Sequence, residues 1–373
     1  MSKTKTSDQI KREQEKRSME RIYNMMKTIE KGILNGQPPE LEMPGRGMNN
    51  AIYDKEKHRL VLGDKKTKRK YLNVAHTRKF MQTLKVADAC YNELLKKHKT
   101  TTIRDLFYSV LGTIPGTKIQ TFDDQNESNQ VSVDLEVALG LAREDFNLVA
   151  ESSGSVVGNV VIEDHNDIID WSKMGSGGWS VPSIVDHIVF KKVNAKFILY
   201  VEKKAVWNRL REDEVWKKYN CVLVATRGQS DRGTRRLIKR MSEEFDLPVY
   251  VFTDSDPYGW YIYSVIKYGS MALPHTSEYL ATPNAKFAGM SMDDLEKYNI
   301  PKSHTLPMKP TDIKRAKEMM KYPWFQSEFW QKQLKKAIES KRKAELQSLA
   351  KYGIEFISET YIPDKIKNKD FVD

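Results

Sequence analysis

Three short apolar runs in the second half of the chain alternate with segments of helical pattern. The runs cover residues 197–201, 221–225 and 249–253. Each run is too short and too rich in β-branched residues for a helix, so the alternation predicts parallel strands joined by crossover helices. We therefore expect a mixed α/β chain, in which residues 195–373 form a parallel sheet flanked by helices and a C-terminal helical extension.

Acidic side chains follow the first and third of these runs. Glu202 comes directly after the first run, and Asp254 and Asp256 come directly after the third. The carboxyl ends of parallel strands meet at one edge of a sheet, where open α/β folds bind ligands. Three carboxylates held close together repel one another unless a cation lies between them. Because the motifs contain no histidine or cysteine, these hard oxygen ligands predict Mg²⁺ as the cofactor.

A second interpretation of the same three acids stays open. Glu202 is then an ordinary surface acid, and Asp256 only caps the helix that begins at Pro257. Their common position at strand ends favours the metal site.

The N-terminal half of the chain has a helical pattern followed by two short apolar runs. The predicted helices cover residues 77–97, 102–110 and 129–141. The runs at 147–150 and 156–162 flank a Ser-Ser-Gly turn and predict a hairpin. Three helices and a hairpin are the parts of a winged helix-turn-helix, which binds DNA through its third helix and its hairpin wing. We therefore expect residues 76–190 to form such a domain.

Residues 1–75 predict an extension and a linker ahead of that domain. The expected parts are an amphipathic helix at 18–31, a linker at 36–47, and a hairpin of strands 58–62 and 70–74 that turns at Gly63. At the other end of the chain, the pattern predicts a helix at 312–320 and a long helix at 328–350.

Composition narrows the class of protein. The net charge of +12 is spread along the chain and favours a polyanionic partner. No apolar run is long enough to span a bilayer, and the charged N-terminus does not have the pattern of a signal peptide. The two cysteines, Cys90 and Cys221, show neither metal-ligand spacing nor a disulfide framework. We expect an intracellular protein that does not bind membranes.

Arg104 and Tyr108 are four residues apart in the helix predicted at 102–110, and therefore lie on the same face. A tyrosine is a poor nucleophile at neutral pH because its pKa is about 10. A neighbouring guanidinium favours the phenolate and binds a phosphate oxygen, which is the pairing that a phosphotyrosine-forming enzyme needs. Taken alone, the pattern favours an aromatic that packs in the core or lines a groove.

The wider context changes that interpretation. Residues 102–108, TIRDLFY, resemble the active-site segment of the DNA-cleaving chain of topoisomerase VI and of the related meiotic double-strand-break transesterase. Glu202, with Asp254-Ser255-Asp256, resembles the acidic motifs of the Toprim domain that follows the winged helix in this family. Many members have two adjacent tyrosines, but Phe107 takes the first position here, which leaves Tyr108.

The resemblance implies the DNA-cleaving and religating subunit of an ATP-dependent type IIB topoisomerase. Tyr108 would form a 5′-phosphotyrosyl bond, and Arg104 would orient the phosphate. Asp254 and Asp256 would hold Mg²⁺, and Glu202 would bind metal or act as the general acid. The resemblance also implies DNA contacts by Lys203, Arg227, Arg235, Arg236, and two glycines of a glycine-rich wing, Gly154 and Gly158.

The implied partners are double-stranded DNA and an ATP-binding B subunit. The sequence contains no P-loop motif, so ATP would be bound by that partner in an A2B2 heterotetramer. A homodimer of the chain would share each active site between two copies. We expect a cytoplasmic, nucleoid-associated archaeal protein, or a nuclear one if it is eukaryotic. The alternatives are a meiotic-type break-forming enzyme, a hydrolytic Toprim nuclease with a structural Tyr108, and a DNA-binding protein without catalysis.

Overall fold

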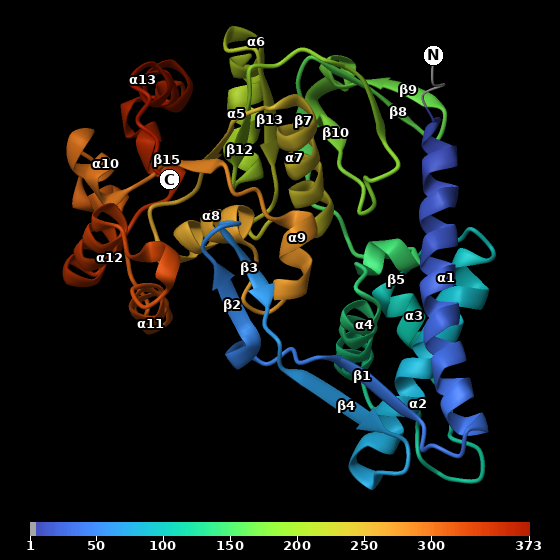
Figure 1. Cartoon of the computed structure of the whole chain (residues 1–373). Coiled ribbons are helices and arrows are strands. Elements are labelled where there is room, and N and C mark those ends of the chain that lie inside the picture. The colour runs from blue at the N-terminus through green and yellow to red at the C-terminus, as the bar shows by residue number, and fades with distance from the viewer. Residues whose placement is uncertain (1–4) are drawn as a thin grey trace.

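A six-stranded sheet forms the centre of the larger half of the molecule (Figure 1). The computed structural model describes residues 5–373. The strand order is β10-β7-β13-β12-β14-β15, and the last four strands are parallel. They are β13 (Cys221–Ala225), β12 (Phe197–Val201), β14 (Val249–Phe252) and β15 (Ala285–Gly289). The three predicted strands and their parallel pairing are therefore confirmed.

Helices cover this sheet because its central strands are buried on both faces. Every residue of β12 and β13 is buried. The covering helices include α5 (Lys204–Glu212), α6 (Val215–Lys218), α7 (Arg232–Phe245), α8 (Pro257–Tyr268), α9 (Ser277–Leu280) and α10 (Met292–Lys297). Large aromatic side chains such as Trp207, Trp260 and Tyr263 are fully buried and fill the core between these layers. This packing fixes the strand ends that carry the acidic residues.

The C-terminal part packs against the same sheet through α11 (Pro310–Met319), α12 (Glu328–Ser340) and α13 (Ile362–Lys367). The prediction of one helix over residues 328–350 was wrong. Helix α12 ends at Ser340 because Lys341 takes a left-handed conformation with φ of 51°. The chain then forms β17 (Arg342–Lys343), which pairs with β16 (Leu306–Pro307), and this pairing turns the following residues toward the acidic strand ends.

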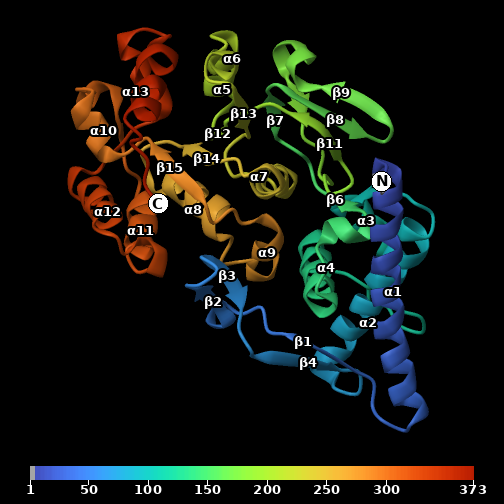
Figure 2. The same cartoon turned by 45° about the horizontal axis from the view of Figure 1, so that its top comes forward.

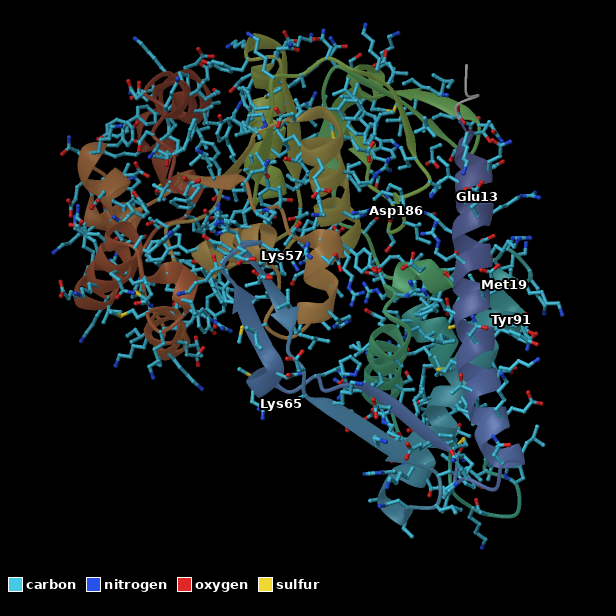
Figure 3. The ribbon with its side chains drawn as sticks, viewed as in Figure 1. Glu13, Met19, Lys57, Lys65, Tyr91 and Asp186 are labelled. Carbon is cyan, nitrogen blue, oxygen red and sulfur yellow. The ribbon has the colours of Figure 1, made fainter. Side chains whose placement is uncertain are left out.

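The smaller half is helical, and its core is a separate cluster of buried side chains. Helices α2 (Val74–Ala89), α3 (Ile103–Val110) and α4 (Gln125–Leu139) confirm the three predicted helices. Helix α1 (Ser7–Leu34) is longer than the predicted 18–31 and begins at a capping box of Thr6 and Gln9. It runs along this half in both views (Figures 1 and 2). Met19 of α1 and Tyr91 lie beside each other at this contact (Figure 3).

Residues 40–70 connect the two halves and do not form the predicted linker and hairpin. Strand β1 (Glu40–Pro44) pairs with β4 (Lys66–Lys70), and β2 (Ala51–Asp54) pairs with β3 (Arg59–Leu62). The basic run of β4 is held by cross-strand ion pairs, with Lys66 2.7 Å from Glu42 and Lys68 2.9 Å from Glu40. Strand β1 packs on α4, whereas β3 packs on α9, so the segment bridges the halves.

The hairpin predicted as a wing does not form. Strand β6 (Leu148–Val149) pairs with β5 (Thr101–Thr102), whereas β7 (Ser155–Val157) joins the six-stranded sheet between β13 and β10 (Trp179–Ser180). Strand β8 (Val160–Asp164) pairs with β9 (Asp167–Asp170) and β11 (Val189–Val193) in a separate three-stranded sheet. The division of the chain at residues 75, 190 and 195 stays a prediction. Within residues 5–373, no helix is both long enough and apolar enough to cross a bilayer.

Candidate active site

Glu202 and Asp254 meet at the carboxyl edge of the sheet, as the strand pattern predicts. Strands β12 and β14 are parallel neighbours with Val201 opposite Phe252, so both lead to the same edge. The backbone N–H of Asp254 donates a hydrogen bond to Oε2 of Glu202 at 3.0 Å. Both side chains are buried, with residue exposures of 8% for Glu202 and 5% for Asp254.

Asp256 reaches this edge from the first turn of α8. Its carboxylate accepts a hydrogen bond from the backbone N–H of Gly259 at 2.7 Å, so it caps the helix as the alternative interpretation expects. Its other oxygen lies 3.6 Å from Nζ of Lys343. The two interpretations of Asp256 therefore do not exclude each other.

The segment after β17 covers the carboxylates and was not foreseen from the sequence. The backbone N–H of Leu346 donates to Oδ1 of Asp254 at 2.9 Å. Lys203 lies 2.7 Å from Oδ2 of Asp254 and 3.0 Å from Oε2 of Glu345. Glu345 is thus a fourth acid at the site. It stands in a lysine-rich stretch far along the chain from Asp254, and no local pattern marks it.

The site holds more negative charge than its lysines neutralise. Burial and the neighbouring Asp254 raise the pKa of Glu202 to about 8. Burial also raises the pKa of Asp254, although Lys203 acts in the opposite direction. Carboxylates that lose protons this reluctantly gain most from a hard cation, and every side chain that offers a lone pair here is a carboxylate. The donor set therefore fits a divalent ion such as Mg²⁺.

Tyr108 and Arg104 are presented to solvent on α3. The helix begins at Thr102, whose hydroxyl accepts a hydrogen bond from the backbone N–H of Asp105 at 3.0 Å. Tyr108 is 61% exposed and Arg104 is exposed too. Within residues 5–373, neither side chain makes a hydrogen bond or an ion pair. Phe107 packs against the helical core instead, so α3 separates a packing aromatic from an exposed one.

The structure does not bring Tyr108 to the carboxylates of the same chain. In both views α3 lies among α1, α2 and α4, whereas β12, β14 and α8 lie in the other half of the molecule (Figures 1 and 2). An active site that uses all of these residues therefore needs a second copy of the chain or a large rearrangement.

A group of basic side chains borders the acidic edge. Arg227 follows β13, is exposed, and its backbone pairs with that of Lys203. Nζ of Lys204 lies 3.4 Å from the ring centroid of Trp207. Burial, followed by the nearby Arg227 and Arg211, lowers the pKa of Lys204 to about 8. Cations that disfavour one another in this way are ready to bind an anion.

Two other arginines expected to contact DNA are occupied within the chain. Arg235 is 5% exposed, and burial lowers its pKa to about 10. Nε of Arg236 lies 2.7 Å from Asp186, and its guanidinium also donates to the carbonyl of Tyr279 at 3.2 Å. Neither guanidinium presents a free edge to a phosphate, so their assignment as DNA contacts is corrected.

The two glycines assigned to a DNA-binding wing are also buried within the chain. A Cβ at Gly154 would lie 2.1 Å from Oγ1 of Thr234, and one at Gly158 would lie 3.2 Å from Cα of Val222. Both positions need glycine because β7 and the turn after it pack closely against the six-stranded sheet. These glycines serve packing, and the assignment to DNA is corrected.

Comparisons with known proteins agree with this architecture. Residues 197–366 match the Toprim domain shared by Spo11 and the A chain of topoisomerase 6, and residues 78–148 match a model described as type IIB DNA topoisomerase. Residues 150–194 match the all-beta domain in DNA topoisomerase VI alpha subunit. The third match covers the segment that we had assigned to a wing, which is β-structured but packs against the central sheet.

Three curated relatives span nearly the whole chain, and each is the A chain of a topoisomerase 6. The chain is 44% identical to that of the type 2 DNA topoisomerase 6 of Pyrococcus abyssi over 358 residues, which is 94% of each chain. It is 40% identical to the corresponding protein of Sulfurisphaera tokodaii over 100% of each chain. It is 36% identical to the corresponding DNA topoisomerase 6 protein of Arabidopsis thaliana, over 94% of this chain and 80% of the relative.

The fold and the matched domains define the class as the type II DNA topoisomerases. Within that class, the chain belongs to the A-chain family of topoisomerase VI, of type IIB. The resemblance carried by residues 102–108 and by the acidic motifs is confirmed. Toprim topoisomerases generally use a divalent metal, in agreement with the carboxylates at the edge of the sheet.

Proposed function

We propose that the chain is the DNA-cleaving and religating subunit of its topoisomerase, with Tyr108 as the nucleophile. The observation that supports this most is the exposure of Tyr108 and Arg104 one turn apart on α3, with neither side chain engaged elsewhere in residues 5–373. A core aromatic would be covered, as Phe107 is. The family membership of the segment that carries Tyr108 supports the same role.

The proposed reaction is a transesterification. The phenolic oxygen of Tyr108 attacks a backbone phosphorus, a bond from oxygen to phosphorus forms at the 5′ side, and the bond from phosphorus to the 3′ oxygen breaks. Arg104 binds a non-bridging oxygen and stabilises the phenolate after its proton passes to solvent. The phosphodiester is retained as a phosphotyrosine, so religation is the reverse step and needs no ATP.

Glu202 is suited to protonate the departing 3′ oxygen. With a pKa of about 8, its carboxyl group holds a proton at neutral pH and takes it back during religation. Asp254, Asp256 and Glu202 would hold the divalent ion, which we propose to be Mg²⁺. When bound there, the ion supplies positive charge for the phosphate oxygens. Lys203 and Arg227 stand beside the carboxylates and would bind the neighbouring phosphates.

Each active site is proposed to form between two copies of the chain. A double-strand break needs one tyrosine per strand, and a two-fold dimer matches the pseudo-two-fold of duplex DNA. The separation of α3 from β12 and β14 within one chain supports this arrangement (Figure 1). Strand passage also needs ATP, which an ATP-binding B subunit would supply in an A2B2 assembly. The sequence itself has no P-loop.

Cleavage of supercoiled duplex by the reconstituted complex, stopped with denaturant, tests the proposal. A covalent bond between DNA and this chain supports the topoisomerase function. Cleaved DNA without attached protein would indicate a hydrolytic Toprim nuclease, and binding without cleavage would indicate a DNA-binding protein. Relaxation that depends on ATP and on the B subunit separates a topoisomerase from a break-forming transesterase, and the names of the curated relatives favour the topoisomerase.

A further inference from the structure

Two histidines and an aspartate gather where α1 meets the three-stranded sheet, in a place that the proposed reaction does not use. Asp164 ends β8, His165 stands in the turn to β9, and His187 lies just before β11. One ligand atom from each residue lies within 4.8 Å of those of the other two. The rings of His165 and His187 are 4.8 Å apart between centroids.

Asp8 of α1 holds one of these histidines in a defined orientation. Nδ1 of His165 lies 3.1 Å from Oδ1 of Asp8, which leaves its Nε2 available as a ligand. The other oxygen of Asp8 accepts a hydrogen bond from Asn166 at 2.7 Å, so the carboxylate is itself held in place. A carboxylate behind an imidazole that binds metal is the arrangement that fixes the tautomer and makes the free nitrogen more basic.

His187 is buried and only partly satisfied. It is 4% exposed, and its Nε2 lies 2.9 Å from Oδ1 of Asp164. Its Nδ1 is buried and has no hydrogen-bond partner in the part of the chain that the structure describes. Buried polar atoms without a partner are uncommon because each costs the free energy of its lost hydration. A bound cation beside this ring would remove that cost.

We propose that Asp164, His165 and His187 form a binding site for a borderline divalent ion of the Zn²⁺ class. Two imidazole nitrogens and one carboxylate oxygen suit zinc, whereas the acidic edge of the sheet offers oxygen ligands only and suits Mg²⁺. Asp8 supports His165 from behind, and the exposed side of His165 leaves a further coordination position open to water.

The ion would pin the first turn of α1 to the tip of the β8–β9 hairpin. The two elements already touch, since the backbone N–H of Ser7 donates to Oε1 of Glu163 at 3.0 Å. Both views show the N-terminal end of α1 beside β8 and β9 (Figures 1 and 2). Because α1 packs on the helical half, an ion here ties the helical half to the β-rich segment. We therefore expect a structural role, separate from the chemistry of DNA cleavage.

Binding of Zn²⁺ and Co²⁺ to the full chain, in excess Mg²⁺ to occupy the carboxylate edge, tests the site. We expect wild type to bind one Zn²⁺ per chain by calorimetry, and Co²⁺ to give the visible absorption of a tetrahedral or five-coordinate nitrogen-containing site. His165→Ala and Asp164→Asn should each weaken binding at least about 10-fold, and Asp8→Asn by about 10-fold through its effect on His165. His304→Ala removes an exposed histidine elsewhere and should bind as wild type does.

Thermal unfolding provides a second readout. Zn²⁺ should raise the midpoint of wild type and of His304→Ala, but not that of His165→Ala. His165 is half exposed, so its replacement should leave the circular dichroism spectrum unchanged. If Zn²⁺ binds wild type and His165→Ala equally, or if it binds neither above the level of a protein without the cluster, the proposal is overturned.

Discussion

The backbone N–H of Asp254 donates a hydrogen bond to the carboxylate of Glu202 at 3.0 Å, which joins the ends of β12 and β14. The two carboxylates are therefore held close together in a buried setting, where burial and their mutual repulsion raise the pKa of Glu202 to about 8. This contact connects the topology of the sheet to its chemistry. A parallel sheet supplies the proximity, and proximity supplies a carboxyl group that can carry a proton at neutral pH.

The raised pKa of Glu202 predicts how stability depends on pH when metal is absent. The folded state keeps a proton up to about pH 8, whereas the unfolded chain releases it near its ordinary pKa of 4.5. Stability is therefore fully present below pH 4.5 and is lost as pH rises toward 8. Glu202→Gln cannot ionise, so its free energy of unfolding in EDTA should fall less across this window, by roughly 1–3 kcal/mol. Urea unfolding at several pH values measures this, and parallel curves would refute the burial argument.

The position of Arg227 predicts a contact with the DNA backbone. It is exposed, it borders the carboxylate edge, and Lys204 and Arg211 are close by. Arg227→Ala should weaken duplex binding equally for different sequences and reduce the salt dependence by about one phosphate. Lys367→Ala removes one exposed charge on α13 and is the matched control. Equal losses in both variants would mean that only net charge matters.

The buried position of Gly154 predicts a defect in stability. Alanine there would place Cβ 2.1 Å from Oγ1 of Thr234 and 3.0 Å from Val181. We expect Gly154→Ala to lose about 1–3 kcal/mol of stability, with the DNA affinity of the folded fraction unchanged. Gly177→Ala meets no atom within 4 Å and should behave as wild type. A fully stable Gly154→Ala variant with weakened DNA binding would restore the wing interpretation.

The sheet and its acids could be predicted because burial on both faces leaves a clear mark. Residues 197–201 and 221–225 are uninterrupted apolar runs, and each is a fully buried strand. The rule that parallel strands present their carboxyl ends at one edge then placed Glu202 beside Asp254 without knowledge of the helices. Tyr108 needed the family resemblance, since an exposed and a packed aromatic at residues 107–108 look alike in sequence.

Other parts of the fold depend on contacts that the sequence does not reveal locally. The short apolar run at 155–157 fits a hairpin as well as an edge of the central sheet, and only packing against β13 decides between them. Strand β4 looked like a solvated basic loop because its partners, Glu40 and Glu42, lie more than twenty residues away. Helix α12 ends at Lys341 with no glycine or proline to mark the change. Glu345 reaches the site through that unmarked turn.

The separation of α3 from the carboxylates predicts active sites shared between two chains. Tyr108→Phe and Asp254→Ala subunits are mixed with the B subunit, once exchange between dimers has been verified with labelled chains. If sites form in trans, a mixed dimer has one site with both defects and one with neither, and it should nick one strand. If sites form within one chain, every site carries one defect and no nicking returns.

The central claim is that Tyr108 becomes covalently attached to DNA, and trapping the attached product tests it most directly. Wild-type complex, incubated with supercoiled duplex and Mg²⁺ and stopped with denaturant, should yield chains linked to 5′ ends, and peptide mapping should place the link at Tyr108. Tyr71→Phe is the matched control, since Tyr71 is 44% exposed and far from the proposed chemistry. We predict the adduct for wild type and for Tyr71→Phe, and none for Tyr108→Phe. An adduct in Tyr108→Phe at the wild-type level would contradict the account.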